Sequence, residues 1–158
     1  MTPAINIAKK SRVAHTLHEY AHDVASESYG LEAAEKLAVD EARVFKTLVV
    51  RLNDNSFAVG ILAVSSMLSM KLIAKAVGAK KAVMADIADV ERATGYVLGG
   101  VSPLGQKRQL TTVIDESARN FDTIYISAGR RGLEIELNPI DLQKLTTGLF
   151  ASIATNTH

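Results

Sequence analysis

The chain has 158 residues, 47% of them hydrophobic, which suits one compact domain over residues 1–158 and is short for two. Its 18 Lys and Arg residues nearly balance 17 Asp and Glu residues, so binding of a polyanion must depend on local clusters of positive charge. The lack of cysteine excludes disulfides, zinc–thiolate sites and a cysteine nucleophile.

The N-terminal part predicts helix, strand, loop and helix in that order. Thr2 before a proline is typical of a helix N-cap, so we expect a helix over residues 3–10. The alternation of side chains over residues 13–20 favours a strand. Residues 21–30 are polar and Ser-rich, which indicates a loop, and the pattern then predicts a helix over about residues 31–38.

The middle of the chain predicts a β-hairpin followed by a helix. Residues 44–52 and 57–64 are β-rich, apolar runs, and the intervening Asn-Asp-Asn-Ser is typical of a turn. Ser69 is a suitable N-cap for a helix through residue 77, and Gly78 suits the left-handed position after its end.

The C-terminal half continues to mix helices and strands. Asp86 predicts a helix to about Thr94, after which residues 95–105 are rich in glycine. Further strands are predicted at residues 112–114, 123–127 and 133–137, and Asn138-Pro139 predicts a last helix to about Thr147. The whole pattern favours a mixed α/β fold, in which helices surround a curved, barrel-like mixed sheet.

Lys46 is the first candidate for chemistry. In an extended segment it shares a face with Val44, Leu48 and Val50, so the pattern places a cation on an apolar face. One interpretation is a side chain that reaches out to solvent at the end of a sheet. The other is an electrophile for an anionic substrate or transition state.

The glycine pair Gly99 and Gly100 is the second candidate. Such a loop can direct consecutive backbone N–H groups toward one point and so stabilise a phosphate or an oxyanion. The alternative is an ordinary tight turn. The segment lacks the Lys-Ser/Thr ending of a P-loop and the spacing of a dinucleotide fingerprint, which disfavours a nucleotide-hydrolysing enzyme.

Metal and serine chemistry are not supported by the pattern. The first three of the four histidines lie on one strand and its exit loop without a helical pair spaced by four residues, so we predict no metal and no cofactor. No serine lies in a Gly-x-Ser-x-Gly elbow. The histidines are His15, His18, His22 and His158.

Basic residues recur in pairs along the chain. Several of these pairs could form a rim for an anionic ligand if they converge in space, although solvated surface positions explain most such pairs. Lys71 and Lys75 lie one turn apart on a predicted helix and share a face. The candidates for such a rim are Lys71, Lys75, Lys80 and Lys107.

Several segments together resemble the YbaK/EbsC family. They include Val44-Phe45-Lys46-Thr47-Leu48 and Arg130-Arg131-Gly132-Leu133. The most specific one is the run Thr94-Gly95-Tyr96-Val97-Leu98-Gly99-Gly100-Val101-Ser102-Pro103-Leu104-Gly105-Gln106-Lys107. The segments are spread over nearly the whole chain and agree with the family in order and spacing.

The resemblance implies a domain similar to the editing domain of bacterial prolyl-tRNA synthetase. It further implies a trans-editing deacylase that removes cysteine from mischarged tRNA(Pro), with aminoacyl-tRNA and prolyl-tRNA synthetase as partners. The implied catalytic residues are Lys46, Tyr20, Gly99 and Gly100, and Ser102 of the same motif is expected to contact the substrate. The implied mechanism uses the substrate's own thiol to attack its ester carbonyl.

Two alternatives remain open at this stage. One is a deacylase for alanine or another small amino acid, and the other is a non-catalytic tRNA- or synthetase-binding module. No leader-like segment opens the sequence, and its longest apolar run is too short to cross a bilayer. We therefore expect a cytoplasmic protein without membrane contact.

Overall fold

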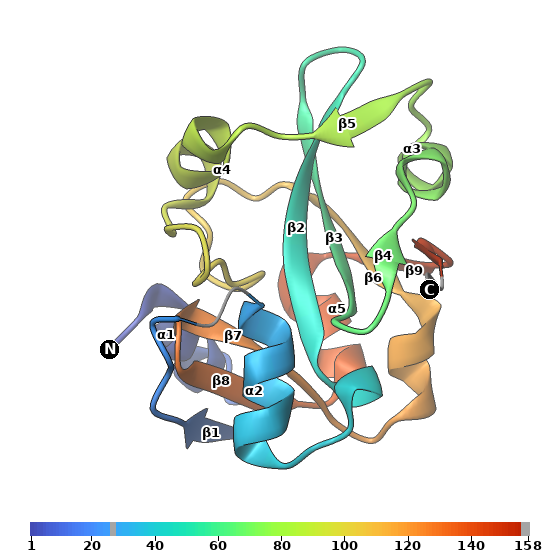
Figure 1. Ribbon diagram of the computed structural model, residues 1–158. Helices are drawn as coiled ribbons and strands as arrows, with labels where there is room; N and C mark the ends of the chain where they lie inside the picture. Colours follow the sequence, from blue (N-terminus) through green and yellow to red (C-terminus); the bar gives the residue numbers. More distant parts are fainter. Residues whose placement is uncertain (26–27, 156–158) are drawn as a thin grey trace.

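The structure is a computed structural model that describes residues 1–25 and 28–155 (Figure 1). Its largest sheet has five strands in the order β5-β2-β3-β6-β9. The hairpin of β2 and β3 is antiparallel, as is the pair of β2 and β5, whereas β6 runs parallel to both β3 and β9. The strands are β2 (Phe45–Leu52), β3 (Phe57–Ala63), β5 (Ala82–Met84), β6 (Thr111–Asp115) and β9 (Leu149–Ala151).

A second sheet has three antiparallel strands in the order β1-β8-β7. These are β1 (His15–Glu19), β7 (Ile124–Arg130) and β8 (Leu133–Leu137). An isolated bridge between Val44 and Tyr125 brings this sheet against the start of β2. A third, two-stranded sheet pairs β4 (Met67–Leu68) with β10 (Ala154–Thr155).

Five α-helices and two short 3-10 helices surround the sheets in the described part of the chain. Two predicted N-caps form their hydrogen bonds: the Thr2 hydroxyl accepts the Ile5 amide at 3.2 Å and the Ser69 hydroxyl accepts the Leu72 amide at 3.1 Å. Asp86 precedes its predicted helix, but its side chain accepts no capping hydrogen bond. The helices are α1 (Pro3–Lys10), α2 (Tyr29–Leu37), α3 (Met70–Val77), α4 (Ile87–Thr94), α5 (Pro139–Thr146), and the 3-10 helices Glu41–Arg43 and Glu116–Asn120.

Both faces of β2 are covered, because the chain packs on each side of the five-stranded sheet. Phe45 and Val49 point into the main core, together with residues of β3, β7 and β8. Val50 points the opposite way, into a smaller core beneath Ile73 and Ala74 of α3. Most side chains of this strand are therefore at least partly buried, and Arg51 near its end is exposed.

The predicted mixed α/β fold with a mixed sheet and surrounding helices is confirmed. The described strands form three separate sheets and do not close into a barrel. The sequence pattern missed the short strands β4, β5, β9 and β10, because two or three residues carry no detectable alternation. No helix in the described ranges is both long and apolar enough to cross a membrane.

The predicted loop at residues 21–30 and the helix after it need a correction. Helix α2 begins at Tyr29, two residues earlier than predicted, so the end of the predicted loop is helical. Ala38 has a left-handed backbone and ends the helix at Leu37. Residues 26 and 27 of the predicted loop lie outside the described residues.

Candidate functional site

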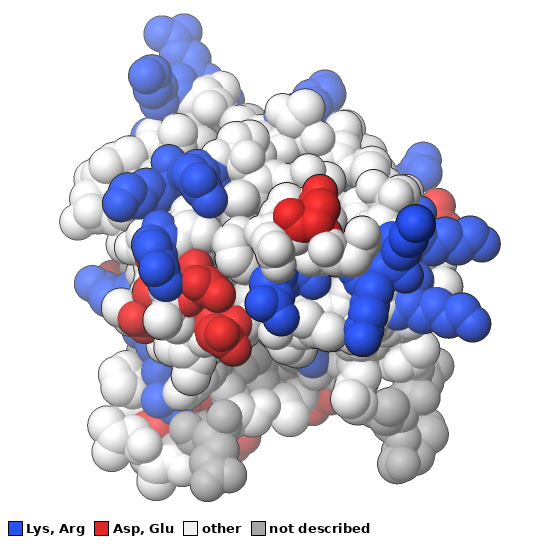
Figure 2. Space-filling view, turned by 90° about the horizontal axis from the view of Figure 1, so that it is seen from above, with Lys and Arg blue, Asp and Glu red and all other residues white. Residues whose placement is uncertain are grey.

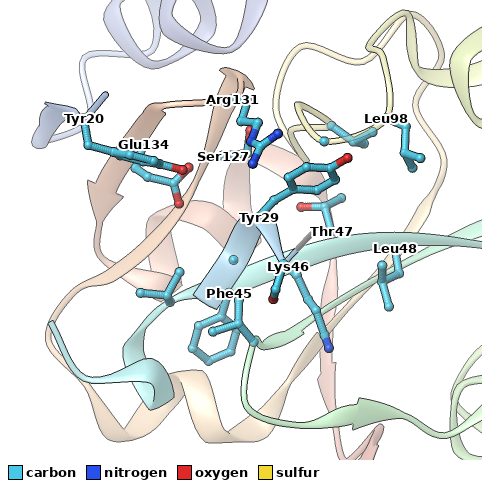
Figure 3. A pocket seen from close by; sticks show the side chains of 16 residues that line it. Tyr20, Tyr29, Phe45, Lys46, Thr47, Leu48, Leu98, Ser127, Arg131 and Glu134 are labelled. Atoms are coloured by element: carbon cyan, nitrogen blue, oxygen red, sulfur yellow. The ribbon is translucent and has the colours of Figure 1, made fainter. Parts of the chain in front are cut away.

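A cavity of about 280 Å³ lies between the start of β2, the N-terminal end of α2 and the glycine-rich segment (Figure 3). It brings together three residues predicted from the sequence, Tyr20, Lys46 and Gly99. The residues that line it are Tyr20, Ser28, Tyr29, Gly30, Val44, Phe45, Lys46, Thr47, Leu48, Val64, Leu98, Gly99, Val101, Ser127, Arg131 and Glu134.

Lys46 is half-buried in this cavity, as the alternation of β2 predicts. Its Nζ donates a hydrogen bond of 2.6 Å to the Ser66 carbonyl in the turn between β3 and β4. Figure 3 shows the side chain extending from β2 toward that turn. Burial removes the ammonium from water and lowers the pKa of Lys46 below its usual value. The charge is thus placed beside a cavity and satisfied by one backbone oxygen.

Glu134 is the residue that the sequence analysis missed. It lies on β8, is only 7% exposed and lines the cavity. Within residues 1–25 and 28–155 its carboxyl group has no hydrogen bond or ion pair. Burial raises the pKa of Glu134 to about 8, so the group is mostly a neutral acid at pH 7.

Tyr20 lies one residue beyond β1, and its amide donates to the Gly132 carbonyl at 2.9 Å. Figure 3 shows the Tyr20 ring beside the Glu134 carboxyl group. Burial, followed by the nearby carboxyl groups of Glu134 and Glu32, raises the pKa of Tyr20 to about 12. The hydroxyl therefore stays protonated at neutral pH and can donate a hydrogen bond to a ligand.

Tyr29 and Arg131 form another wall of the cavity. The Arg131 guanidinium lies 4.3 Å from the centre of the Tyr29 ring, within the range of a cation–π interaction. The same guanidinium lies 3.3 Å from an oxygen of the buried Glu32 and donates to the Asp23 carbonyl at 2.8 Å. Arg131 thereby ties α2 and the segment before it to the turn between β7 and β8.

The glycine-rich segment places Gly99 and Gly100 differently from each other. Gly99 lines the cavity in a left-handed conformation, with φ of +92°. Gly100 does not line this cavity, and its amide already donates to the Val97 carbonyl at 2.9 Å. The segment is held in place by Tyr96, whose buried hydroxyl donates to the Leu104 carbonyl at 2.6 Å. The Gly99 amide is therefore the better placed of the two predicted oxyanion donors.

Replacing Gly99 with alanine should lower both stability and activity. The new Cβ would lie 3.1 Å from a Tyr29 ring carbon, and a left-handed backbone costs a residue with a side chain about 1–2 kcal/mol. Gly78→Ala is a matched control, since Gly78 has φ of +74° but no atom within 4 Å of the added carbon. We expect both variants to lose free energy of unfolding, measured in urea, and Gly99→Ala to lose more because of its contact with Tyr29. Only Gly99→Ala should lose the deacylation that the family resemblance implies. Equal activity of the two variants would contradict this role of Gly99.

Ser102, expected to contact the substrate, lies outside the residues that line the cavity. It has no exposed surface, and its hydroxyl accepts the Leu104 amide at 3.2 Å. Its carbonyl accepts a hydrogen bond from the Gln106 side chain at 3.0 Å. In this structure, Ser102 stabilises the glycine-rich segment through hydrogen bonds to Leu104 and Gln106.

The predicted basic rim is divided between two places. Lys71 and Lys75 are exposed on α3, and Lys80 lies near the β2–β3 turn, where its amide donates to the Asn53 side chain. Lys107 is on the side of α4, where it lines a hollow with Arg92. Figure 2 shows separate groups of Lys and Arg residues on this face, with acidic residues between them. The four lysines do not form one continuous rim.

Because the net charge is near zero, we expect tRNA binding that weakens steeply with salt. Each phosphate neutralised by a lysine contributes a slope of about −0.9 to the logarithm of affinity against the logarithm of salt concentration for duplex nucleic acid. Removing two of the lysines predicted to contact phosphate, Lys71→Gln with Lys75→Gln, should flatten the slope, whereas Lys144→Gln on α5 is a control. Fluorescence anisotropy of labelled tRNA at several salt concentrations measures the affinity and therefore the slope. An unchanged slope in the double variant would mean that α3 does not contact tRNA.

Histidines and acidic residues do not form a metal cluster among the described residues. The His15 ring forms a hydrogen bond with the Val13 carbonyl, and the His18 ring forms one of 2.9 Å with the Glu136 carboxyl group. His22 lies in the open groove beyond the cavity, and His158 is outside the described residues.

The cavity can thus bind a small polar group and stabilise negative charge. Lys46 and the Tyr20 hydroxyl are donors, and a neutral Glu134 adds an O–H group without repelling an anion. Thr47 also lines the cavity, and its buried hydroxyl oxygen has no hydrogen-bond partner in the described structure. This chemistry suits the transition state of acyl transfer, in which a carbonyl oxygen becomes negative.

Comparison with known proteins gives a consistent result. A family model described as "Aminoacyl-tRNA editing domain" matches residues 27–145. The protein "Putative Cys-tRNA(Pro)/Cys-tRNA(Cys) deacylase EbsC" of Enterococcus faecalis (strain ATCC 700802 / V583) is 38% identical over 157 residues. That alignment covers 98% of this chain and 93% of the relative.

Two solved structures share the fold over nearly their whole length. The crystal structure of "hypothetical protein APE2540" has a TM-score of 0.87 at 22% identity and covers 98% of this chain and all of that chain. The crystal structure of "a putative trans-editing enzyme for prolyl tRNA synthetase" has a TM-score of 0.82 at 21% identity and covers 98% and 99%.

Proposed function

Because this chain belongs to the aminoacyl-tRNA editing domain family, which includes proteins of the YbaK/EbsC type, we propose that it acts in trans on mischarged tRNA(Pro) and hydrolyses the ester bond that holds cysteine. The observation that carries this proposal is the half-buried Lys46 ammonium beside a cavity of about 280 Å³, in a chain 38% identical to a relative named for cysteinyl-tRNA deacylation. Prolyl-tRNA synthetase is the proposed partner that supplies the mischarged tRNA.

The proposed mechanism uses the thiol of the bound cysteine as the nucleophile. Its sulfur attacks the ester carbonyl carbon, the C–S bond forms, and the C–O bond to the terminal ribose breaks. The thiol proton is transferred through solvent to the departing ribose oxygen, and water then opens the cyclic thioester to cysteine. The protein itself has no cysteine, and this mechanism requires none. The task of the protein is to hold the ester carbonyl and the thiol of the substrate close together.

Lys46 has the main electrostatic role in this mechanism. Its ammonium group exchanges the Ser66 carbonyl for the oxyanion that forms on the substrate, and the Gly99 amide and Tyr20 hydroxyl are further donors. Glu134 remains protonated, which keeps a second negative charge away from that oxyanion. Selectivity follows from chemistry, because alanine and proline have no thiol with which to attack.

The alternative substrate is tRNA charged with alanine or another small amino acid. Water or the ribose hydroxyl would then replace the thiol as the nucleophile. The decisive experiment incubates the purified protein with tRNA(Pro) charged separately with cysteine, alanine and proline, and with tRNA(Cys) charged with cysteine. We expect cysteine to be released from tRNA(Pro) much faster than alanine or proline. Faster release of alanine would favour the alternative, and no release at all would favour a binding module.

A further inference from the structure

Strand β1 forms a free edge of the three-stranded sheet. It pairs with β8 on one side, and no other strand of the described chain pairs with it on the other side. Figure 1 shows β1 at the outer margin of this sheet. The opposite edge strand, β7, instead lies against the start of β2, through the bridge between Val44 and Tyr125. An unpaired edge presents backbone donors and acceptors with which another strand can pair.

The backbone groups on this free edge follow from the pairing with β8. The Tyr20 amide donates to the Gly132 carbonyl, so the backbone of Tyr20 faces β8. Successive residues of an antiparallel strand alternate in direction, so the backbone groups of His18 and Thr16 face β8 as well. The amides and carbonyls of the other residues of β1 therefore point away from the sheet. These residues are His15, Leu17 and Glu19.

The side chains of β1 do not protect this edge. The strand, His-Thr-Leu-His-Glu, contains neither the lysine nor the proline that commonly block edge pairing. Leu17 lies at its centre and is 39% exposed. Its partner on β8, Ile135, is fully buried in the main core, so Leu17 extends the apolar face of the sheet to an open margin. The edge strands of the five-stranded sheet, β5 and β9, have three residues each and offer shorter edges.

The sequence of β1 is complementary to itself in the antiparallel direction. When two copies meet with Leu17 opposite Leu17, the outward-pointing amides and carbonyls of the two strands face each other. The same register places His15 of each copy opposite Glu19 of the other. His15 uses Nδ1 for its hydrogen bond with the Val13 carbonyl, which leaves Nε2 for this contact. Glu19 is also available, because its pair with Arg130 is 3.9 Å long and both side chains are largely exposed.

We propose that two copies of this chain associate by antiparallel pairing of β1 with β1, about a twofold axis at Leu17. The two three-stranded sheets then form one continuous sheet, and the two Leu17 side chains meet on the same face. Tyr20, which lines the cavity, directly follows β1, so the interface holds the strand from which this residue extends. The association requires no substrate and is independent of the proposed function.

The twofold axis allows a test that distinguishes this interface from others. In Leu17→Lys, like charges of the two copies face each other, and Leu17→Glu has the same effect with the opposite charge. Each variant alone should dimerise about tenfold more weakly than the wild type or worse, because it loses an apolar cross-strand contact and adds repulsion. A mixture of the two variants should dimerise again, since opposite charges then face each other. Sedimentation velocity over a range of protein concentrations measures this association.

Met84→Lys is the matched control for these variants. Met84 is 49% exposed on β5, an edge strand of the other large sheet, so the substitution introduces the same charge in a comparable position. We expect its dimerisation to equal that of the wild type. Circular dichroism and thermal denaturation check that every variant folds.

Amide hydrogen exchange tests the register of the pairing. The amides of His15, Leu17 and Glu19 should exchange more slowly as the protein concentration rises, because they are bonded to a second strand only in the dimer. The amides of Thr16 and His18 should be protected at every concentration, because they are bonded to β8.

Several outcomes would overturn the proposal. A wild-type protein that stays monomeric at every soluble concentration has no such interface. A dimer that survives Leu17→Lys forms through another surface. The proposal also fails if the mixed variants stay monomeric while the wild type dimerises, or if the outward amides exchange at a rate that does not depend on concentration.

Discussion

A Lys46→Ala variant should fold normally and lose deacylation by a factor on the order of a hundred or more, the usual effect of removing one preorganised donor to an oxyanion. The loss should appear in kcat, because the charge interacts more strongly with the transition state than with the neutral ester. Single-turnover hydrolysis of cysteinyl-tRNA(Pro) measures it directly.

The stability of the same variant should change little. Removing the side chain ends the cost of keeping a half-buried ammonium out of water, but it also leaves the Ser66 carbonyl without that donor. These two effects oppose each other, so we expect a change in the free energy of unfolding within about 1 kcal/mol. Urea denaturation followed by circular dichroism measures it.

The matched control is Arg51→Ala. Arg51 lies on the same strand, is exposed and does not line the cavity, so this variant removes one positive charge from β2 without touching the site. We expect its rate to stay close to that of the wild type. A folded Lys46→Ala protein with unaltered turnover would remove Lys46 from the mechanism. A large loss of stability would instead assign Lys46 to holding the β3–β4 turn.

A Glu134→Gln variant should be more stable than the wild type at pH 8, with the difference vanishing as the pH falls toward 4.5. The folded protein keeps the Glu134 proton up to its pKa of about 8, whereas the unfolded chain releases it near its usual pKa of 4.5. Between these values the unfolded state binds fewer protons, so raising the pH favours unfolding by at most about 1.4 kcal/mol per pH unit. Glutamine stays neutral and lacks this pH dependence.

Denaturant unfolding at pH 3.5, 5, 6.5 and 8 tests this prediction, and Glu136→Gln is a control of opposite sign. Glu136 lies two residues along β8, where hydrogen bonds from Thr123 and then His18 keep the pKa of its carboxyl group low. Replacing it should lower stability near neutral pH and have less effect in acid, below its usual pKa. A constant difference between Glu134→Gln and wild type across this pH range would mean that Glu134 ionises like an exposed glutamate.

The sequence by itself determined the five helices to within a few residues, the β2–β3 hairpin and the position of Lys46 on its strand. Caps such as Thr2 and Ser69 act within one turn of the chain, so their signals are complete in a few consecutive residues. The face that Lys46 shares with Val50 follows from the two-residue repeat of a strand. Motif order and spacing also indicated the family, which the comparisons confirm.

Only the tertiary structure decided which polar groups are buried together. The alternation Leu-Glu-Ile-Glu-Leu of β8 is typical of a strand with one solvent-exposed face. Glu134 on that face is nevertheless buried, whereas Glu136 accepts hydrogen bonds from Thr123 and His18. The difference arises because Glu134 lies beside a cavity that includes the start of α2, whose residues are about one hundred positions away in the chain. The contact between Arg131 and Tyr29, and the separation of Lys107 from Lys71, have the same origin. Contacts between residues far apart in the sequence determine which side chains are buried and which charges lie near one another. No local repeat of the sequence encodes these contacts.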